Sequence, residues 1–513
     1  MKEKKKKSSK RMRKWHKWLG LFFAFFIIMF SISGILLNHR KAISGLDISH
    51  SVLPKDYRYE NWNNGAVKGT IRLTPELVLM YGGGGVWLTD TLGSRFEAFV
   101  DGMPKGADNR MINSMVHTPN DEVFAVATFG LYRLDKENNL WLDISERIDS
   151  HERFCDLVVK GDSLILLTRS NIFVATAPYE QFDKITLAVP DDYKREATLF
   201  RTMWTLHSGE LLGLAGKLFV DLLGIVVIVL SVTGVLLTIF PKIAKRRRKK
   251  QLPTKAQSDA YKATLKWHNK PGVILFVFFL ILTVSGTFLR PPLLIAIIRT
   301  KVKTIPGTVL HKPNVWYDKL RTLRYDAFEK DWILYSSDGF FSLKDLEGTP
   351  VKMRKIPPIS IMGVNVLEQT DTTTWLAGSF SGIYYWDRQT GESLDAYTMK
   401  KVAPRRPGPP TLSNAVSGYS SDFGDKQVVF DYSKGAKLLH SDEPFIPMPV
   451  FIRKEGKMSL WHLSLEVHVG RIYKPLLGVL TDLFIFLSGV IFTTILVSGY
   501  IVYRRRHKKR KRG

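Results

Sequence analysis

The sequence predicts a membrane protein with four transmembrane α-helices and an all-β extracytoplasmic domain. Three observations predict this fold class. Four long apolar runs divide the 513 residues, clusters of lysine and arginine border these runs, and the segments between them carry repeated strand-and-turn patterns. A chain of this length is too long for one small domain, so separate membrane and β-rich parts are expected.

The apolar runs cover residues 19–37, 212–240, 273–289 and 475–502. Each is long enough, or nearly so, to cross a hydrocarbon core of roughly 30 Å at about 1.5 Å per residue. The first run could instead belong to a signal peptide. It is too long for one and no Ala-x-Ala site follows it, so we expect an uncleaved membrane anchor.

The net charge of +28 is concentrated beside the apolar runs. Residues 1–18, 241–268 and 504–513 together hold 28 lysines and arginines but two acids, so these flanks carry +26. Lysine and arginine collect on the cytoplasmic side of membrane helices and also attract anionic lipid. We therefore expect a multi-pass membrane protein with both termini cytoplasmic and the bilayer as its first partner. The nearly neutral remainder argues against a nucleic-acid partner.

The expected organisation is one plan used twice: helix, outer segment, helix. It comprises a basic cytoplasmic tail (1–18), transmembrane helices (19–38, 207–240, 270–290 and 468–503), β-rich extracytoplasmic segments (41–200 and 291–460), a basic cytoplasmic loop (241–268) and a second basic tail (504–513).

Spacings on the outgoing helices indicate that the plan arose by internal duplication. Gly34 follows His16 by eighteen residues, and Gly286 follows His268 by eighteen residues. Eighteen residues make five helical turns, so each histidine shares a helix face with its glycine. Small residues at such positions let helices, or a flat cofactor, approach closely.

The returning helices repeat less tightly. His207-x-Gly precedes Asp221 by fourteen residues, and His468-x-Gly precedes Asp482 by fourteen residues. Lys217 lies four residues before Asp221, and we expect these two side chains to form an ion pair. The second copy has Gly478 at the position of the lysine, which weakens any shared proton relay.

The outer segments contain a shorter repeat of two strands separated by a polar turn. Its spacing lies in the forties, as in propeller blades. Three copies in each segment predict one split β-propeller of about six blades; an ordinary β-sandwich or two separate sheets are the alternatives. The landmarks are Val86, Leu131 and Ile172 (45 and 41 residues apart) and Phe340, Ile383 and Val428 (43 and 45 apart).

Four histidines near the ends of the expected membrane helices, His16, His207, His268 and His468, are candidate metal ligands. The duplication equates His16 with His268 and His207 with His468, so each pair is expected to meet on one side of the membrane. Two neutral imidazoles from different helices are what a low-spin b-type haem needs as axial ligands, and a haem between helices needs no covalent attachment. We therefore expect two non-covalent b haems, one near each surface.

For any single histidine, the competing interpretation is an interface anchor, because tryptophan, lysine and histidine are common at membrane boundaries. The repeat supports ligation, and His39 and His462, which have no repeat partner, are interpreted as anchors. Cations that would suit haem carboxylates are Lys17 and Lys270 inside and Arg40, Lys217, Arg290 and Arg471 outside. Tryptophans expected near a macrocycle are Trp15, Trp204, Trp267 and Trp461.

The sequence lacks the motifs of several enzyme and cofactor-binding classes. The single cysteine, Cys155, rules out an internal disulfide and a CxxCH site for covalent haem. We find no Walker or Rossmann glycine loop and no HExxH, GxSxG or CxxC motif, which disfavours a hydrolase or a nucleotide-driven pump.

The helices resemble those of the PepSY-associated transmembrane family. The segment RKWHKWLGLFFAFFIIMFSISGILL is similar to the first helix of that family in His16, Gly20 and Ser33-Gly34, and residues 205–237 are similar to its returning helix. The resemblance implies a protein of a bacterial inner (plasma) membrane that is associated with iron uptake, similar to ferric-siderophore reductases that carry b haems on histidines. The outer segments depart from the family because no PepSY domain is evident in them.

Two hypotheses follow. In the first, the protein transfers electrons from a cytoplasmic quinol or reduced flavoprotein to an extracytoplasmic ferric complex. In the second, it is a non-enzymatic receptor, sensor or scaffold whose propeller-like ectodomain binds a protein or other ligand. A transporter subunit ranks third, because the helices offer few intramembrane charges. Haem content separates the first two.

Overall fold

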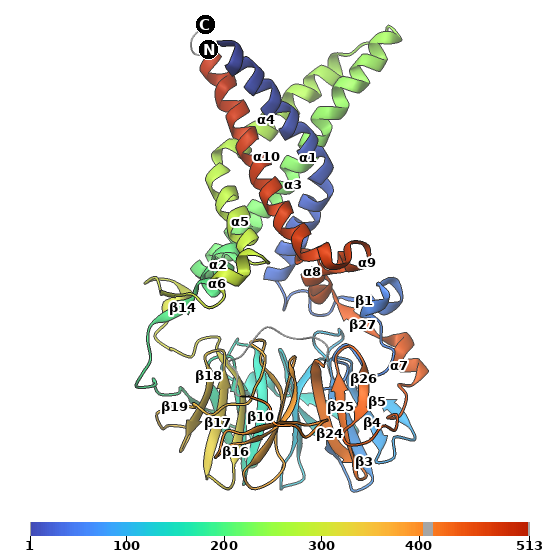
Figure 1. Ribbon diagram of the computed structural model, residues 1–513. Helices are drawn as coiled ribbons and strands as arrows, with labels where there is room; N and C mark the ends of the chain where they lie inside the picture. Colours follow the sequence, from blue (N-terminus) through green and yellow to red (C-terminus); the bar gives the residue numbers. More distant parts are fainter. Residues whose placement is uncertain (1, 404–413, 511–513) are drawn as a thin grey trace. The chain divides into compact units, whose positions relative to one another are not determined.

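The computed structural model describes residues 2–403 and 414–510, with side chains between residues 10 and 506. The chain divides into two compact units (Figure 1). The helical unit comprises Met1–Arg40, Arg195–Lys312 and Trp461–Gly513, and the β unit comprises Lys41–Lys194 and Pro313–Leu460. Each unit is assembled from segments that are distant in sequence.

Three helices are long and apolar enough to cross a membrane, within the part of the chain that the structure describes. They are α1 (Lys2–Asn38), α3 (Gly213–Lys249) and α10 (Thr481–Arg510), and α1 contacts both of the others. Large apolar side chains on them are exposed, for example Phe22 at 71% and Leu222 at 51%. Such surfaces are stable when lipid, rather than water, surrounds the helix.

The helix expected at 270–290 is broken. α4 (Lys255–Ile274) and α5 (Phe276–Phe288) meet at a bend of 68°, and they count as a fourth span only if the pair is taken together. Pro271 lies in the last turn of α4, where its missing N–H and its ring weaken the helix just before the bend. A short separate helix, α6 (Leu293–Ile297), follows Pro291-Pro292.

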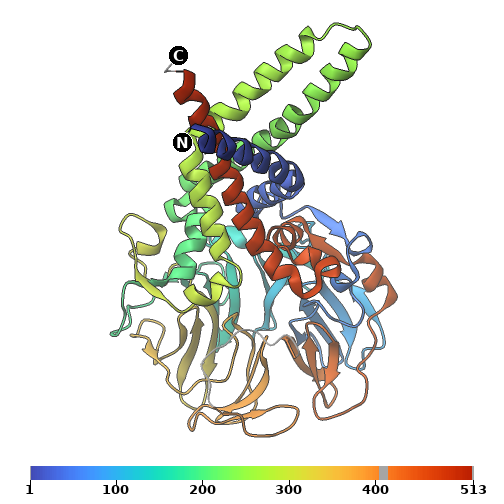
Figure 2. The same ribbon diagram turned by 45° about the horizontal axis from the view of Figure 1, so that its top comes forward.

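The basic segment 241–268, expected as a loop, is mostly a helical hairpin (Figure 2). α3 continues to Lys249, and α4 begins at Lys255 after a short turn. Lysine, arginine and alanine are good helix formers, so the segment extends both helices until Pro253 interrupts them.

The helices expected at 207–240 and 468–503 are each interrupted near their start. α2 (Leu199–Ser208) ends at Gly209 (φ 78°), and α8 (Leu460–His468) ends just before Gly470 (φ 79°). A left-handed glycine ends a helix because it has no Cβ to clash. The His-x-Gly motif therefore puts its histidine in the last turn of a short helix. Before α3 and α10 come η4 (Glu210–Leu212), η6 (Arg471–Tyr473), α9 (Lys474–Leu477) and η7 (Gly478–Leu480).

In its described residues, the β unit contains six antiparallel sheets in which sequential strands pair. Three sheets come from each outer segment. The sheets are β2–β5 (Gly69–Arg72, Leu77–Gly82, Gly85–Asp90, Phe96–Ala98), β6–β9 (Ile112–His117, Val123–Ala127, Leu131–Asp135, Leu140–Asp143), β10–β13 (Phe154–Lys160, Ser163–Thr168, Ile172–Thr176, Asp183–Ile185), β16–β19 (Leu320–Asp326, Asp331–Ser336, Gly339–Leu343, Val351–Lys352), β20–β23 (Val364–Gln369, Thr374–Ser379, Gly382–Asp387, Ser393–Asp395) and β24–β26 (Val416–Phe423, Lys426–Asp431, Gly435–Leu438).

The first strands of the six sheets follow one another in a closed series. Each of β2, β6, β10, β16, β20 and β24 contacts the next, and β24 contacts β2. The closure joins chain segments about 350 residues apart: the hydroxyls of Thr70 and Ser420 lie 2.6 Å apart, and Thr70 Oγ1 donates to Asp422 Oδ2 over 2.6 Å. Five of the six repeat landmarks lie on third strands; Val428 lies on β25, the second strand of its sheet.

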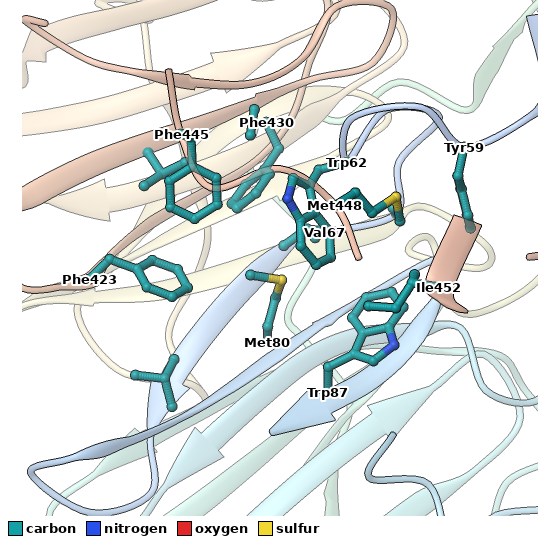
Figure 3. Close-up of a cluster of buried hydrophobic side chains, with 14 of the residues drawn as sticks. Tyr59, Trp62, Val67, Met80, Trp87, Phe423, Phe430, Phe445, Met448 and Ile452 are labelled. Atoms are coloured by element: carbon teal, nitrogen blue, oxygen red, sulfur yellow. The ribbon is translucent and has the colours of Figure 1, made fainter. Parts of the chain in front are cut away.

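A buried apolar cluster joins the first and last sheets (Figure 3). Trp62 is fully buried there, and its Nε1 donates to the carbonyl of Ile446 over 2.9 Å. Met80 and Trp87 of the first sheet pack in the same cluster as Phe430 of the last. Burial of large side chains of this kind stabilises the closure by about 1.5–3 kcal/mol for each one removed from water.

Aspartates end many strands and close the following turns. Oδ1 of Asp135 accepts N–H groups from Glu137 and Asn138, and Asp326 and Asp431 make the same pair of bonds two and three residues ahead. An aspartate side chain can take the place of a main-chain acceptor in such turns. The polar turns of the repeat thus have a specific structural role.

Short strand pairs lie near the ends of the outer segments. β1 (Asp47–Ser49) pairs with β27 (Lys457–Ser459) in the β unit, and β14 (Glu196–Thr198) pairs with β15 (Lys301–Lys303) in the helical unit. The remaining short elements are η1 (His50–Val52), η2 (Lys55–Tyr57), η3 (Ser145–Arg147), η5 (Val309–His311) and α7 (Val450–Glu455).

A buried ion cluster between two sheets provides a test of the β unit. Arg388 donates to Asp326 and, over 2.7 Å, to Asp331 Oδ2. Replacing Arg388 by alanine leaves two buried carboxylates unpaired, so we expect the free energy of unfolding to fall by about 3–5 kcal/mol. The measurement is denaturation of the full-length protein in detergent, followed by tryptophan fluorescence.

The control is Lys401→Ala, which removes an exposed pair with Glu392 and should change the same free energy by less than about 1 kcal/mol. Equal effects of the two substitutions would contradict the buried ion cluster.

Candidate functional site

The structure brings the four predicted histidines together as two pairs. His16 on α1 faces His268 on α4 with ring centroids 6.0 Å apart and ring planes at 68°. His207 on α2 faces His468 on α8 with centroids also 6.0 Å apart and planes at 51°. These are the two pairs that the internal repeat equates.

Each histidine is held by a main-chain carbonyl of a neighbouring helix. The Nδ1 atoms lie 2.9–3.0 Å from these oxygens. A carbonyl only accepts, so Nδ1 carries the hydrogen and Nε2 of the neutral ring keeps its lone pair. This is the tautomer of a metal-binding imidazole whose other nitrogen is oriented by a hydrogen bond. The pairs are His16 with Ile495, His207 with Leu282, His268 with Leu230 and His468 with Phe30.

Each of these carbonyls lies four residues before a glycine that contacts the same ring. A Cβ on Gly286 would lie 2.6 Å from Cε1 of His207, and one on Gly499 would lie 2.8 Å from Cε1 of His16. At Gly34 the distance to Cε1 of His468 would be 3.1 Å, and at Gly234 the distance to Cε1 of His268 would be 3.3 Å. The glycines thus let the rings approach the helix backbone.

The residue before each glycine supplies a hydroxyl. Thr233 Oγ1 lies 3.0 Å from Nδ1 of His268, and Ser33 Oγ lies 3.1 Å from Nδ1 of His468. Ser285 Oγ lies 3.3 Å from Nδ1 of His207. Ser498 instead donates to the carbonyl of Ile495, the oxygen that holds His16. The four Ser/Thr-Gly motifs are therefore part of the histidine sites.

The histidine and the glycine that lie eighteen residues apart belong to different histidine pairs. On α1, His16 belongs to one pair, whereas Gly34 contacts His468 of the other. In the second half, His268 belongs to the pair with His16, whereas Gly286 contacts His207 of the other pair. Five turns of α-helix rise about 27 Å, so the pairs lie toward opposite ends of the helices. Aromatic rings of Phe23, Phe30 and Phe492 pack in contact between them.

Three of the four cations expected outside have partners on the helical unit. Arg40 lies over the Trp461 ring, 4.0 Å from its centroid. Arg471 forms a bidentate ion pair with Glu466, and Arg290 forms an ion pair with Asp482. Nε of Arg290 is buried without a hydrogen bond among the described residues.

The prediction of an ion pair between Lys217 and Asp221 is wrong. Asp221 is buried and accepts hydrogen bonds of 2.8 Å from Asn38 Nδ2 and from His39 Nε2, whereas no ion pair to Lys217 forms among the described residues. Contacts from the end of α1 and the residue after it satisfy this carboxylate better than a half-buried side chain one turn away on the same helix. His39, interpreted from the sequence as an anchor, is therefore a hydrogen-bond partner of the buried Asp221.

Three of the four tryptophans expected near a macrocycle are exposed. Trp15, Trp204 and Trp267 are 44%, 42% and 65% exposed, as are side chains at a lipid or interfacial surface. Trp461 is the exception, because its Nε1 donates to the carbonyl of Leu37 over 3.1 Å. The sequence offered no signal for the carbonyl partners, because any residue type supplies a carbonyl.

Comparison with known sequences assigns the family. A sequence profile of the PepSY-associated TM region matches residues 1–240 and 242–506. The chain belongs to the PepSY-associated TM family. The two matched ranges correspond to the two halves of the repeat. No curated protein matches the chain.

Solved structures resemble this PepSY-associated TM protein only distantly. All three of the following share 9% identity with it. The matches include a protein described as the extracellular domain of a hybrid two-component system from B. thetaiotaomicron (TM-score 0.34, 74% of this chain and 32% of that one), an ancestral GH74 enzyme (0.30, 72% and 36%) and PorZ, a surface component of the type-IX secretion system of Porphyromonas gingivalis (0.30, 76% and 39%). The chain thus spans about a third of their length, and their activities have no bearing on its own.

The contact between Gly286 and His207 of the PepSY-associated TM protein can be tested directly. Gly286→Ala forces a methyl group against the ring, so we expect a loss of about 1–3 kcal/mol of stability. Stability is measured by titrating detergent-solubilised protein with sodium dodecyl sulfate and following helix content.

Gly20→Ala is the matched control, because nothing lies within 4 Å of its added Cβ and alanine favours helix by about 1 kcal/mol. If Gly286→Ala is no less stable than Gly20→Ala, the close contact is incorrect.

Proposed function

We propose that this protein transfers electrons across a membrane by means of two non-covalent b haems. His16 and His268 would be the axial ligands of one haem, and His207 and His468 those of the other. The centroid spacing of 6.0 Å in both pairs carries the proposal. Metal–imidazole bonds are about 2 Å long, and each ring centre lies about an ångström farther out, so two imidazoles on opposite sides of one metal have centroids about 6 Å apart.

The donor set fits a macrocyclic metal better than a bare ion. Within the described residues, no three histidine, cysteine, aspartate or glutamate side chains are grouped to hold a metal. Two imidazoles alone leave most positions of a transition metal open, whereas a haem fills four of them itself. A bound haem supplies a one-electron Fe(III)/Fe(II) couple.

The chain contributes orientation and tuning. The Nδ1–H bonds to carbonyls hold each imidazole in one tautomer and make Nε2 a stronger donor. The glycines leave room for the rings, and Phe30 and Phe492 exclude water from the region between the two pairs. Arg40, Arg290, Arg471 and Lys217 would be the cations that contact haem carboxylates, the three arginines alongside the partners they already have.

The basic flanks support one orientation of the helices across the membrane. Under the positive-inside rule, the tail before α1, the α3–α4 hairpin and the end of α10 would be cytoplasmic in a bacterial inner membrane. The His16–His268 pair would then receive electrons from a quinol or reduced flavoprotein, and the His207–His468 pair would deliver them outside. Both histidine pairs would have to be occupied for this route.

The β unit would hold the electron acceptor. Six sheets of three or four strands whose first strands form a closed series support the proposal that this unit is a six-bladed propeller, which would offer a scaffold for a ligand. The family resemblance favours a ferric complex, such as a ferric siderophore. One electron converts Fe(III) to Fe(II), which binds hard oxygen chelators more weakly and can then be released.

Haem content tests the central part of the proposal. Purified wild-type protein should show a reduced b-type α-band and about two haems per chain. His16→Ala should remove one haem, His207→Ala the other, and the double variant both, because each centre loses an axial ligand. The measurement is the reduced-minus-oxidised spectrum with haem extraction.

His151→Ala is the control, since this exposed histidine belongs to the β unit. A colourless wild-type protein from haem-replete cells would make the binding or scaffold function the better one.

The acceptor is tested by reoxidation. Electrode-reduced protein mixed with a ferric hydroxamate chelate should lose its α-band while an Fe(II) indicator gains colour. The His207→Ala variant should react at least tenfold more slowly, because the outer centre is missing. Reoxidation by oxygen but by no ferric chelate would refute the ferric acceptor while leaving the haem assignment intact.

A further inference from the structure

The two halves of the helical unit carry equivalent aspartates with different partners. Asp221 in the third turn of α3 is bonded to Nε2 of His39 over 2.8 Å, and Asp482 in the first turn of α10 is paired with Arg290. Both partners lie just beyond an outgoing helix. A guanidinium stays charged at any physiological pH, whereas an imidazole changes charge near neutrality. One half therefore has a permanent cation where the other has a titratable group.

His39 is placed to exchange protons. Its side chain is 38% exposed, whereas that of Asp221 is 9% exposed. A carboxylate accepts, so Nε2–H of the neutral ring donates to Asp221. Nδ1 makes no hydrogen bond among the described residues, and solvent can protonate it there. The resulting imidazolium would keep its bond to the carboxylate.

The His39–Asp221 site is linked to the His207–His468 pair by short contacts. Asn38 Nδ2 donates both to Asp221 Oδ1 over 2.8 Å and to the carbonyl of Ser208 over 3.3 Å. Ser208 is the residue next to His207. On α1, Gly34 contacts His468 and lies five residues before His39, about 7–8 Å along the axis.

Apart from Lys217, the following charged groups on elements packed against this end of α1 have other partners. Arg40 lies over Trp461, Arg471 pairs with Glu466, and His462 lies 3.5 Å from the same carboxylate. Glu210 lies 3.9 Å from Arg201, and Lys217 is half-buried on α3.

We propose that His39 and Asp221 form a proton-accepting site coupled to the redox centre at His207 and His468. The inference rests on the proposed function. If a haem held there were reduced by one electron from the electron donor, His39 would take one proton from solvent at Nδ1, and no bond of the chain would break. The proton offsets the added negative charge, and this attraction is stronger in a low-dielectric surrounding. By linkage, protonated His39 favours the reduced centre to the same degree.

The coupling predicts a pH-dependent midpoint potential for one haem. In the wild type, the potential of the centre that His207→Ala removes should fall as pH rises, by up to about 59 mV per pH unit for a one-electron, one-proton couple. The other centre should show a smaller dependence. The measurement is redox titration of the purified holoprotein at an electrode between about pH 5.5 and 8.5, with proton uptake followed by an indicator dye.

Two substitutions distinguish the roles of charge and hydrogen bond. His39→Arg copies the Arg290–Asp482 pair, so the potential should stay at the acid limit of the wild type at every pH. His39→Gln keeps a donor for Asp221 without charge, so the potential should stay near the alkaline limit. Neither variant should take up the proton on reduction.

The possible results test the proton-accepting site and the proposed function separately. A slope that persists in both variants, or that is missing in the wild type with both haems present, would overturn the proton-accepting site and leave the proposed function intact. Failure to bind haem at His207 and His468 would overturn both.

Discussion

The close contact between a histidine ring and the backbone of a neighbouring helix is the interaction on which the helical unit depends. An imidazole can reach a helix carbonyl only where the side chain one turn ahead is absent, because a Cβ there would overlap the ring. Glycine provides that space at four positions, and the Nδ1–H bond then fixes both the tautomer and the position of the ring. The orientation of the four imidazoles therefore comes from helix packing, with hydroxyls of Ser33, Thr233 and Ser285 as further contacts.

The same contacts tie the two ends of the membrane part together. α1 places His16 in one pair and offers Gly34 to the other, and the second half repeats this with His268 and Gly286. A shift of one helix would disturb both pairs at once, so the spacing of eighteen residues is constrained at both ends. The bend between α4 and α5 shows that the repeat tolerates a different backbone path when the glycine contact is kept.

The β unit is stabilised by a different kind of constraint. Its first and last sheets come from separate outer segments, and the cluster around Trp62, Met80 and Phe430 joins them. Closure also pairs polar groups of Thr70 and Ser420 that would otherwise lie at open strand edges. Because the chain leaves and re-enters each unit, the outer segments fold with each other and not with the helices next to them in sequence.

The sequence alone determined the apolar runs, the basic flanks, the duplication and the strand repeat, because hydrophobic length, charge and spacing are local properties. It also determined that His16 matches His268 and His207 matches His468, since the repeat equates them. Only the tertiary structure decided that Gly34 serves His468, that Asp221 is bonded to His39 and not to Lys217, and that the helix expected at 270–290 bends. These features depend on which residues of other helices come within a few ångströms, and a main-chain carbonyl or an empty glycine position leaves no mark in the side-chain pattern of its partner.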